Sequence, residues 1–232
     1  DTYYRRFHIA FRRSIKSASS ELDDLFKNVA EVAERIYKNW YLTELNGQWC
    51  TLIRDEMQLH GKVNALPQQV DFYARNVNPF VCNKNRIFVI ISDALRYEVA
   101  VELNQRLVQE TSGNAEISAM QSVFPSLTKY GMAALLPHKE LALTDDLQVL
   151  SDGSSTDGTV NRDKILKTVN SDNCAVIYEE LLALKQAQRR ELVSGAEVVY
   201  IYHNKIDAIG DKQMTENQVF DACEDVVDEL HS

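Results

Sequence analysis

The chain has 232 residues, of which 45% are hydrophobic and 25% are charged, as in an ordinary globular protein with a sizeable core. Its net charge of −9 argues against general nucleic-acid binding, which needs a positive surface against phosphates. No apolar run approaches the roughly 20 residues of a membrane span, and four cysteines without a Cys-x-x-Cys pair argue against a zinc or disulfide framework and favour a cytoplasmic location.

Residues 1–84 are predicted to be helical. Asn46-Gly47 predicts a turn within this region, Pro67 suits the first turn of a later helix, and residues 76–85 are typical of a linker. Apolar residues recur at three- and four-residue spacing between charged ones, as on an amphipathic helix: Leu22, Leu25, Phe26, Val29, Val32, Ile36 and Trp40.

The opening of the chain is locally basic, and Arg5, Arg12 and Lys16 can share one helical face. Such a face suits solvent, a docking surface for other parts of the protein, or a phosphate-binding patch. Asp1 is not a start methionine and a helical pattern continues to Ser232, so we expect the chain to be a fragment of a longer protein.

Residues 87–91 form an unbroken apolar run rich in β-branched side chains, which predicts a strand buried on both faces of a parallel sheet. Fourfold spacing of leucine and valine from Leu95 onward predicts a helix after it. Asp93 therefore lies at the carboxyl end of a strand, where open α/β sheets bind ligands. Its carboxylate suits either capping of the helix or binding of a cation.

From residue 86 onward, strand and helix patterns alternate, which indicates an α/β fold. We therefore predict a helical region over residues 1–84, followed over residues 85–232 by a mostly parallel sheet flanked by helices. The expected elements are strands over 117–120 and 197–202, a Pro-containing turn and helix over 122–136, a mobile surface loop over 151–159, and helices over 165–169, 175–184 and 219–230.

Polar side chains gather at the predicted strand ends and helix starts. Carboxylates that converge there would repel one another unless cations neutralise them. Oxygen and imidazole ligands suit Zn²⁺, Mn²⁺ or Mg²⁺, and a hydroxyl beside such metals can act as a nucleophile. The candidate site residues are Asp93, Ser126, Thr128, His203, Asn204, Asp207 and Asp211.

Each candidate also has an ordinary structural role. Thr128 can cap a helix, and Asp207 and Asp211 can be loop carboxylates. A histidine such as His203 after an apolar strand is more often packed or hydrogen-bonded than a ligand. Only their coincidence at strand ends favours a functional site.

Three motifs carry a resemblance to a known family. Phe124-Pro-Ser-Leu-Thr128 and Asp207-Ala-Ile-Gly-Asp211 resemble the nucleophile and metal motifs of the phosphodiesterase branch of the alkaline phosphatase superfamily. With the segment from Ser92 to Glu98, they are similar as a set to the PglZ domain of BREX-type phage-defence systems, over roughly residues 86–230. The resemblance implies an alkaline phosphatase-like fold, truncated at its carboxyl end.

The same resemblance implies roles for four residues. Thr128 would be the nucleophile, Asp93 a ligand of the metal that activates it, and Asp207 and Asp211 ligands of a second metal. Asp211 stands where the superfamily has histidine, which favours Mg²⁺ or Mn²⁺ over Zn²⁺. The superfamily's later Asp-His pair and final histidine have no match before Ser232, which implies an incomplete site in this chain.

The leading interpretation is thus a metal-dependent phosphoesterase of a phage-defence system, acting on a monoester or on a nucleotide or nucleic-acid diester. Other defence proteins are the expected partners. The alternative is a non-catalytic, phosphatase-like scaffold or interaction module. A weaker third interpretation is a nucleic-acid binder that uses the basic opening segment.

Overall fold

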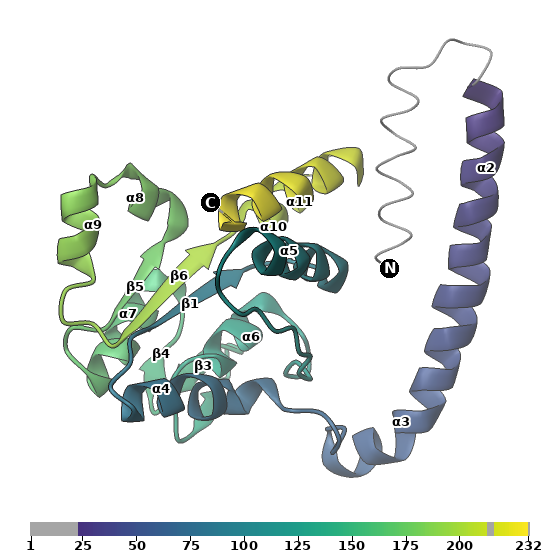
Figure 1. The fold of residues 1–232 in the computed structure, drawn as a ribbon. Coiled ribbons are helices and arrows are strands. Elements are labelled where there is room, and N and C mark those ends of the chain that lie inside the picture. Colours follow the sequence, from purple (N-terminus) through teal and green to yellow (C-terminus); the bar gives the residue numbers. More distant parts are fainter. Residues whose placement is uncertain (1–22, 213–215, 232) are drawn as a thin grey trace. The chain divides into compact units, whose positions relative to one another are not determined.

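The computed structural model describes residues 23–212 and 216–231. The chain divides into two compact units. The first combines Asp1–Val63, Leu95–Ser118 and Ile209–Ser232, and the second combines Asn64–Ala94 and Ala119–Ala208 (Figure 1). The basic residues Arg5, Arg12 and Lys16 lie outside the described residues, so the interpretations of that segment stay untested.

The described part of the first unit is helical. Its helices are α2 (Asp23–Ile36), the π-helix η1 (Tyr37–Leu45), α3 (Asn46–His60), α5 (Tyr97–Glu110) and α11 (Glu216–His231). The first three follow one another without a break and end at Gly61, whose φ of +64° favours glycine. The turn predicted at Asn46-Gly47 is wrong, because helical residues on both sides outweigh a glycine cost of about 1 kcal/mol.

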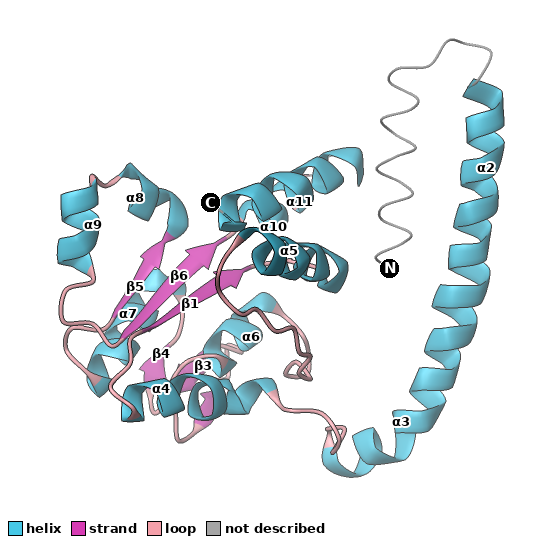
Figure 2. Ribbon diagram, viewed as in Figure 1, coloured by secondary structure: helices cyan, strands magenta, loops and turns pink. Residues whose placement is uncertain are grey.

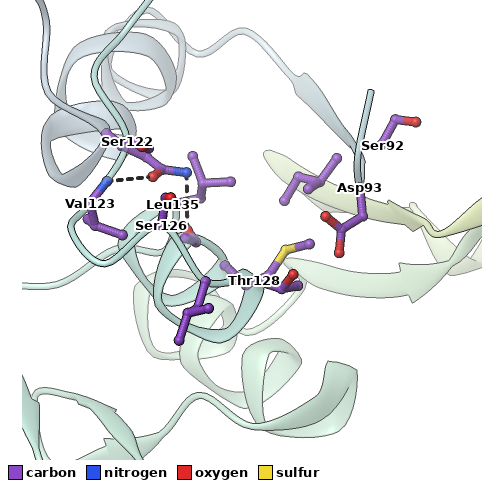
Figure 3. Close-up of a pocket in the computed structure, with 12 residues that line it drawn as sticks. Ser92, Asp93, Ser122, Val123, Ser126, Thr128 and Leu135 are labelled. Carbon is purple, nitrogen blue, oxygen red and sulfur yellow. Dashed lines mark hydrogen bonds between the residues drawn. The ribbon is translucent and has the colours of Figure 1, made fainter. Parts of the chain in front are cut away.

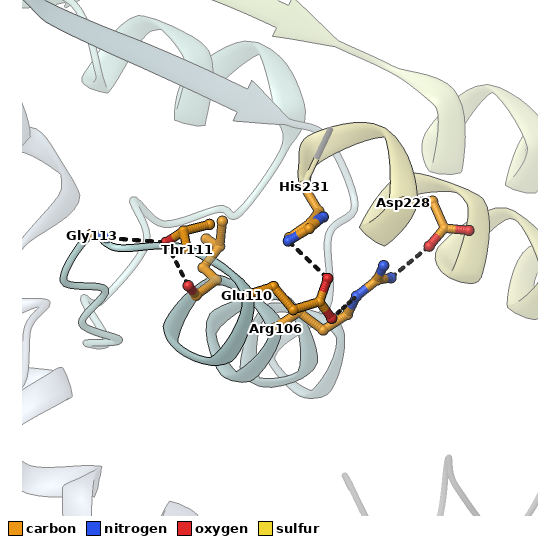
Figure 4. A network of polar contacts seen from close by, with 7 residues as sticks. Arg106, Glu110, Thr111, Gly113, Asp228 and His231 are labelled. Carbon is orange, nitrogen blue, oxygen red and sulfur yellow. Dashed lines mark hydrogen bonds and ion pairs between the residues drawn. The ribbon is translucent and has the colours of Figure 1, made fainter.

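Within the first unit, α5 packs against α11, although their sequences are far apart. Arg106 of α5 bonds Asp228 of α11 at 2.5 Å and lies 3.6 Å from Glu110. The Nε2 atom of His231 lies 3.3 Å from Glu110 on the same side (Figure 4). Two of these contacts, Arg106 with Asp228 and His231 with Glu110, link the two helices.

The second unit is built on a parallel sheet with strand order β1-β6-β5 (Figure 2). The strands are β1 (Ile87–Ser92), β6 (Val198–His203) and β5 (Cys174–Ile177), and β1 and β6 pair in register from Ile87↔Val198 to Ser92↔His203. β6 is central and buried at all six positions. β1 lies at an edge, and its Phe88 and Ile90 are about half exposed, so the prediction that it is buried on both faces is wrong.

The two faces of β6 contribute to two hydrophobic clusters. Val198, Tyr200 and Tyr202 pack on one face, and Val199 and Ile201 pack on the other, as alternation along a strand requires. Helices of the second unit cover this sheet: α6 (Thr128–Ala134), α7 (Gly158–Val169), α8 (Tyr178–Ala183), α9 (Gln186–Leu192) and, at the end of β6, α10 (Lys205–Gly210). The predicted α/β class, with a helical region before a helix-flanked parallel sheet, is confirmed.

A small antiparallel sheet replaces the loop predicted over residues 151–159. It consists of β2 (Leu141–Leu143), β3 (Val149–Ser151) and β4 (Ser154–Ser155), and α7 begins at Gly158. Ser151 and Thr156 are buried because each hydroxyl bonds a carbonyl, that of Pro137 at 3.0 Å and that of Val149 at 2.9 Å. The prediction of a mobile loop from the polar composition of residues 151–159 is therefore wrong.

Two further predicted elements are wrong. Residues 117–120 form no strand, and residues 175–177 belong to β5 rather than to a helix. Short apolar runs do not distinguish a strand from a helix, whereas α8 (Tyr178–Ala183) follows the helix predicted for the rest of that segment.

The residues before β1 belong to the packed second unit. They form η2 (Gln69–Asp71), η3 (Tyr73–Val77) and α4 (Asn78–Cys82), so residues 76–85 are not the irregular linker that was expected. Tyr73 and Val77 are buried in the same cluster as Tyr200. Packing therefore groups residues 64–84 with the sheet, whereas the domain boundary near residue 84 was drawn from a change of sequence pattern and stays a prediction. None of the described helices is both long and apolar enough to cross a lipid bilayer.

Candidate active site

Asp93 follows directly after β1, and the sheet fixes its backbone. Its N–H donates to the carbonyl of His203 at 2.9 Å, and its Oδ1 accepts from the N–H of Ala94 at 3.0 Å. α5 begins only at Tyr97, with Arg96 as its N-cap. Asp93 is therefore not the N-cap of that helix, and the ordinary capping role considered for it is not the one observed.

A pocket of about 310 Å³ opens beside Asp93 within the second unit. Figure 3 shows Asp93 at one side and Ser122, Ser126 and Thr128 across from it. Three predicted site residues, Asp93, Ser126 and Thr128, thus line one pocket. The full lining is Gln69, Ile91, Ser92, Asp93, Ser122, Val123, Ser126, Leu127, Thr128, Gly131, Met132 and Leu135.

Thr128 is the first residue of α6, and Leu127 occupies the N-cap position. The carbonyl of Leu127 accepts hydrogen bonds from the N–H groups of Tyr130 and Gly131, both at 3.0 Å, which begins the helix. Within the described part of the chain, the Thr128 hydroxyl makes no hydrogen bond, so it does not act as a cap. Its side chain is exposed at the pocket, where a substrate can reach it.

Gln69 lines the same pocket and was not among the predicted site residues. Its Oε1 accepts from the N–H of Val123 at 3.1 Å, and its Nε2 donates to the carbonyl of Gly131 at 3.4 Å. No motif contains Gln69, and the only local signal is its place just after Pro67. The region before residue 84, which was predicted to be helical, thus also contributes a side chain to the pocket.

His203 ends β6 and is 1% exposed. Its Nδ1 lies 2.9 Å from the Ser92 hydroxyl, within hydrogen-bonding distance, and its ring meets the Tyr178 ring edge-on at a centroid distance of 4.8 Å. The packed, hydrogen-bonded role considered for this histidine is therefore the one observed. His203 joins the ends of the two strands and does not line the pocket.

Asn204 and Asp207 follow β6 at the edge where β1 ends, since the two strands are parallel and in register. The carbonyl of Asn204 accepts from the N–H of Ala208 at 3.0 Å, and Asp207 lies in the first turn of α10. Neither side chain lines the pocket. Asp211 belongs to the first unit, so its relation to Asp93 stays a prediction.

The metal site remains a prediction, and the side chains that line the pocket can be compared with it. One carboxylate and several hydroxyls offer oxygen atoms, which hard cations such as Mg²⁺ prefer. Over residues 23–212 and 216–231, however, no group of three His, Cys, Asp or Glu side chains is placed to hold a metal ion. Among the described residues, the lining of this pocket thus contains a single carboxylate, that of Asp93.

Comparison with known proteins matches residues 72–232 to the family model described as the BREX system PglZ alkaline phosphatase-like domain. Two similar proteins are the alkaline phosphatase-like protein PglZ of Bacillus cereus (strain H3081.97), 40% identical over 232 residues, and the alkaline phosphatase-like protein BrxZ of Escherichia coli O9:H4 (strain HS), 42% identical over 212 residues. These matches cover 100% and 89% of this chain but only 26% and 24% of the relatives. The chain therefore belongs to the PglZ family of alkaline phosphatase-like domains of BREX systems.

Proposed function

We propose that this chain carries the nucleophile of a metal-dependent phosphoesterase of a BREX defence system. The observation that supports this most directly is the exposed Thr128 hydroxyl, which shares a pocket with the Asp93 carboxylate at the end of a parallel strand. Ligands of open α/β sheets bind at this edge. The substrate would be a phosphate ester, either a monoester or a diester such as a nucleotide or nucleic acid.

In the proposed reaction, the Thr128 hydroxyl oxygen attacks phosphorus in line and the ester oxygen leaves. Water then hydrolyses the phosphothreonine and restores the hydroxyl. Bound divalent metals would lower the pKa of the hydroxyl and neutralise charge on the phosphate. Asp93 would hold the metal next to Thr128, while Asp207 and Asp211 would contribute to a second metal.

The metals would be Mg²⁺, Mn²⁺ or Zn²⁺, and the oxygen-only ligands of this chain favour the first two. Because the chain spans about a quarter of the length of its relatives, we propose that the rest of a longer protein completes the shell. None of the four cysteines, which all lie within the described residues, forms a disulfide bond. This suits the cytoplasm, where we place the protein together with other defence proteins.

A second candidate function is a phosphatase-like scaffold without catalysis. The absence of a three-ligand group among the described residues favours it, as does the aspartate at position 211. In that case the pocket would bind a phosphate group or nothing, and the family's role would lie in contacts with other defence proteins.

The two functions are separated by assaying the full-length protein on a chromogenic phosphodiester with a panel of divalent metals. For the enzyme, we expect metal-dependent turnover that Thr128→Ala lowers by about three orders of magnitude or more and that Thr128→Ser retains in part. Melting should change little, because the Thr128 hydroxyl makes no hydrogen bond with the described residues. A folded Thr128→Ala protein with parental turnover would remove the nucleophile assignment.

A further inference from the structure

We propose that Gln69 is a positioning residue that holds the Thr128 segment, residues 123–131, in place. This proposal rests on the proposed function in one respect only, namely that Thr128 reacts. Gln69 lies outside every motif of the family resemblance, and it reaches the Thr128 segment from the region that precedes β1.

The Gln69 side chain bonds the Thr128 segment at both of its ends. Upstream of Thr128, the N–H of Val123 donates to Oε1 at 3.1 Å, and downstream, Nε2 donates to the carbonyl of Gly131 at 3.4 Å (Figure 3). Ser126 and Thr128 lie between these two attachment points. A carboxamide is suited to this task because one end accepts and the other donates a hydrogen bond.

The backbone around Gln69 is held as well. Its N–H donates to the carbonyl of Gln121 at 2.9 Å, and the N–H of Gln121 donates to the carbonyl of Pro67 at 2.7 Å. These bonds accompany a parallel bridge between Gln68 and Gln121. The backbone of Gln69 is therefore held in place. Its side chain can then act as a clamp, that is, hold the Thr128 segment at two points.

Glycine at position 131 leaves room for this clamp. A Cβ added there would lie 3.3 Å from Nε2 of Gln69, closer than most such contacts, so the amide would have to shift by a few tenths of an ångström to accommodate it. The Gln69 side chain thus packs closely against the Thr128 segment at Gly131. Thr128 and Asp93 line the same pocket. A shift of the Thr128 segment would therefore move the Thr128 hydroxyl relative to the Asp93 carboxylate.

The test compares Gln69→Met with Gln68→Met in the full-length protein. Methionine has a similar length but cannot make either hydrogen bond. Gln68 is the matched control, because its amide donates to the carbonyl of Leu66 at 2.8 Å and to Oε1 of Gln121 at 3.4 Å, and does not line the pocket. The measurements are kcat and KM on the chromogenic phosphodiester, and amide hydrogen exchange of residues 122–131.

For Gln69→Met we expect kcat to fall on the order of tenfold to a hundredfold, with KM changing by less than about threefold, because misplacement affects the reacting geometry more than binding. Exchange at Val123 should accelerate about tenfold or more, since its N–H loses its acceptor. Gln68→Met should leave kcat and exchange near the parental values.

Gln69→Glu serves as a second variant if the methionine protein does not fold. It keeps an acceptor for Val123 but no donor for Gly131, so Val123 should stay protected while kcat still falls. Parental exchange at Val123 in Gln69→Met, or faster exchange with unchanged kcat, would overturn the proposal. If the parent shows no turnover with any metal, the phosphoesterase proposal fails, and the exchange data alone decide whether Gln69 is a clamp.

Discussion

Three tyrosine hydroxyls in the core of the second unit differ in their hydrogen bonding. Tyr200 donates to the carbonyl of Leu135 at 2.6 Å. The hydroxyls of Tyr73 and Tyr202 are buried without a hydrogen-bond partner in the described structure, and Arg162 lies over the Tyr202 ring, 4.8 Å from its centre. Burial raises the pKa of Tyr202 to about 12. Loss of the hydroxyl should therefore have different effects at positions 200 and 202.

Tyr200→Phe should lower the free energy of unfolding by about 1–3 kcal/mol, because the partly buried Leu135 carbonyl loses this hydrogen-bond donor. Tyr202→Phe should leave it within about 1 kcal/mol of the parent or raise it, because it removes a hydroxyl without a partner and keeps the ring. Chemical denaturation, with circular dichroism as the readout, measures the free energy of unfolding of both variants. Equal losses in the two variants would contradict this account.

Asp152 stabilises the small antiparallel sheet through its carboxylate. The carboxylate accepts from the N–H of Glu140 at 2.9 Å and from that of Lys139 at 3.1 Å, and these bonds, with that from Glu140 the stronger, hold the pKa of Asp152 below its ordinary value of 3.8. A carboxylate whose pKa is lower in the folded than in the unfolded protein stabilises the fold. This contribution is complete at pH values above the pKa of the unfolded state and is lost as the pH falls through the pKa of the folded state.

Asp152→Asn should therefore lower the free energy of unfolding at neutral pH, and the difference from the parent should shrink below about pH 4. Asparagine tolerates the φ of +48° at this position, so backbone strain does not confuse the result. Asp157→Asn is the control, because its carboxylate accepts no hydrogen bond from the described residues. A difference from the parent that stays constant from pH 7 to pH 3 would contradict the prediction.

At the scale of elements, β1 and β6 were predictable because both are long apolar runs ended by polar residues. Their parallel pairing places Ser92 opposite His203 and brings Asp93 to the expected edge. The third strand, β5, was not predictable, because Cys174–Ile177 merges without a turn into the helical pattern of α8. The burial of Ser151 and Thr156 was likewise not predictable, because it depends on carbonyls that folding brings next to their hydroxyls.

For the long helix formed by α2, η1 and α3, the sequence did not indicate what packs against its apolar face. Its amphipathic spacing was recognised, yet Trp40, Leu52 and Leu59 are exposed. Spacing predicts that a stripe of apolar residues lies on one face, but it does not identify what covers that face. The sequence therefore predicted helical structure here, but neither its continuity through Asn46-Gly47 nor its packing.

At the scale of the whole molecule, the candidate site was predictable where motifs end strands or begin helices. Asp93, Ser126 and Thr128 do line one pocket. Gln69 was not predictable, because its role depends on bonds to residues 54 and 62 positions away in the sequence. Asp207 lies in α10 and Asp211 follows that helix directly, but neither residue lines the pocket.

Metal binding by the full-length protein tests the proposed ligands apart from turnover. A ligand at a hundred times its dissociation constant stabilises a protein by about 2.7 kcal/mol, so Mn²⁺ or Mg²⁺ should raise the melting temperature of the parent. Asp93→Asn should weaken the affinity about tenfold or more, whereas Thr128→Ala should change it little. Calorimetric titration measures both, and parental affinity in Asp93→Asn would exclude Asp93 as a ligand.

The pairing of α5 with α11 has a consequence for the order of events during synthesis. Arg106 and Asp228 lie 122 positions apart, and the strands β5 and β6 are translated between them. At about 5–20 residues per second, α5 is synthesised roughly 6 to 24 seconds before its partner helix α11. Through that interval the apolar face of the nascent helix has no α11 to cover it, and a chaperone that binds such surfaces has time to act.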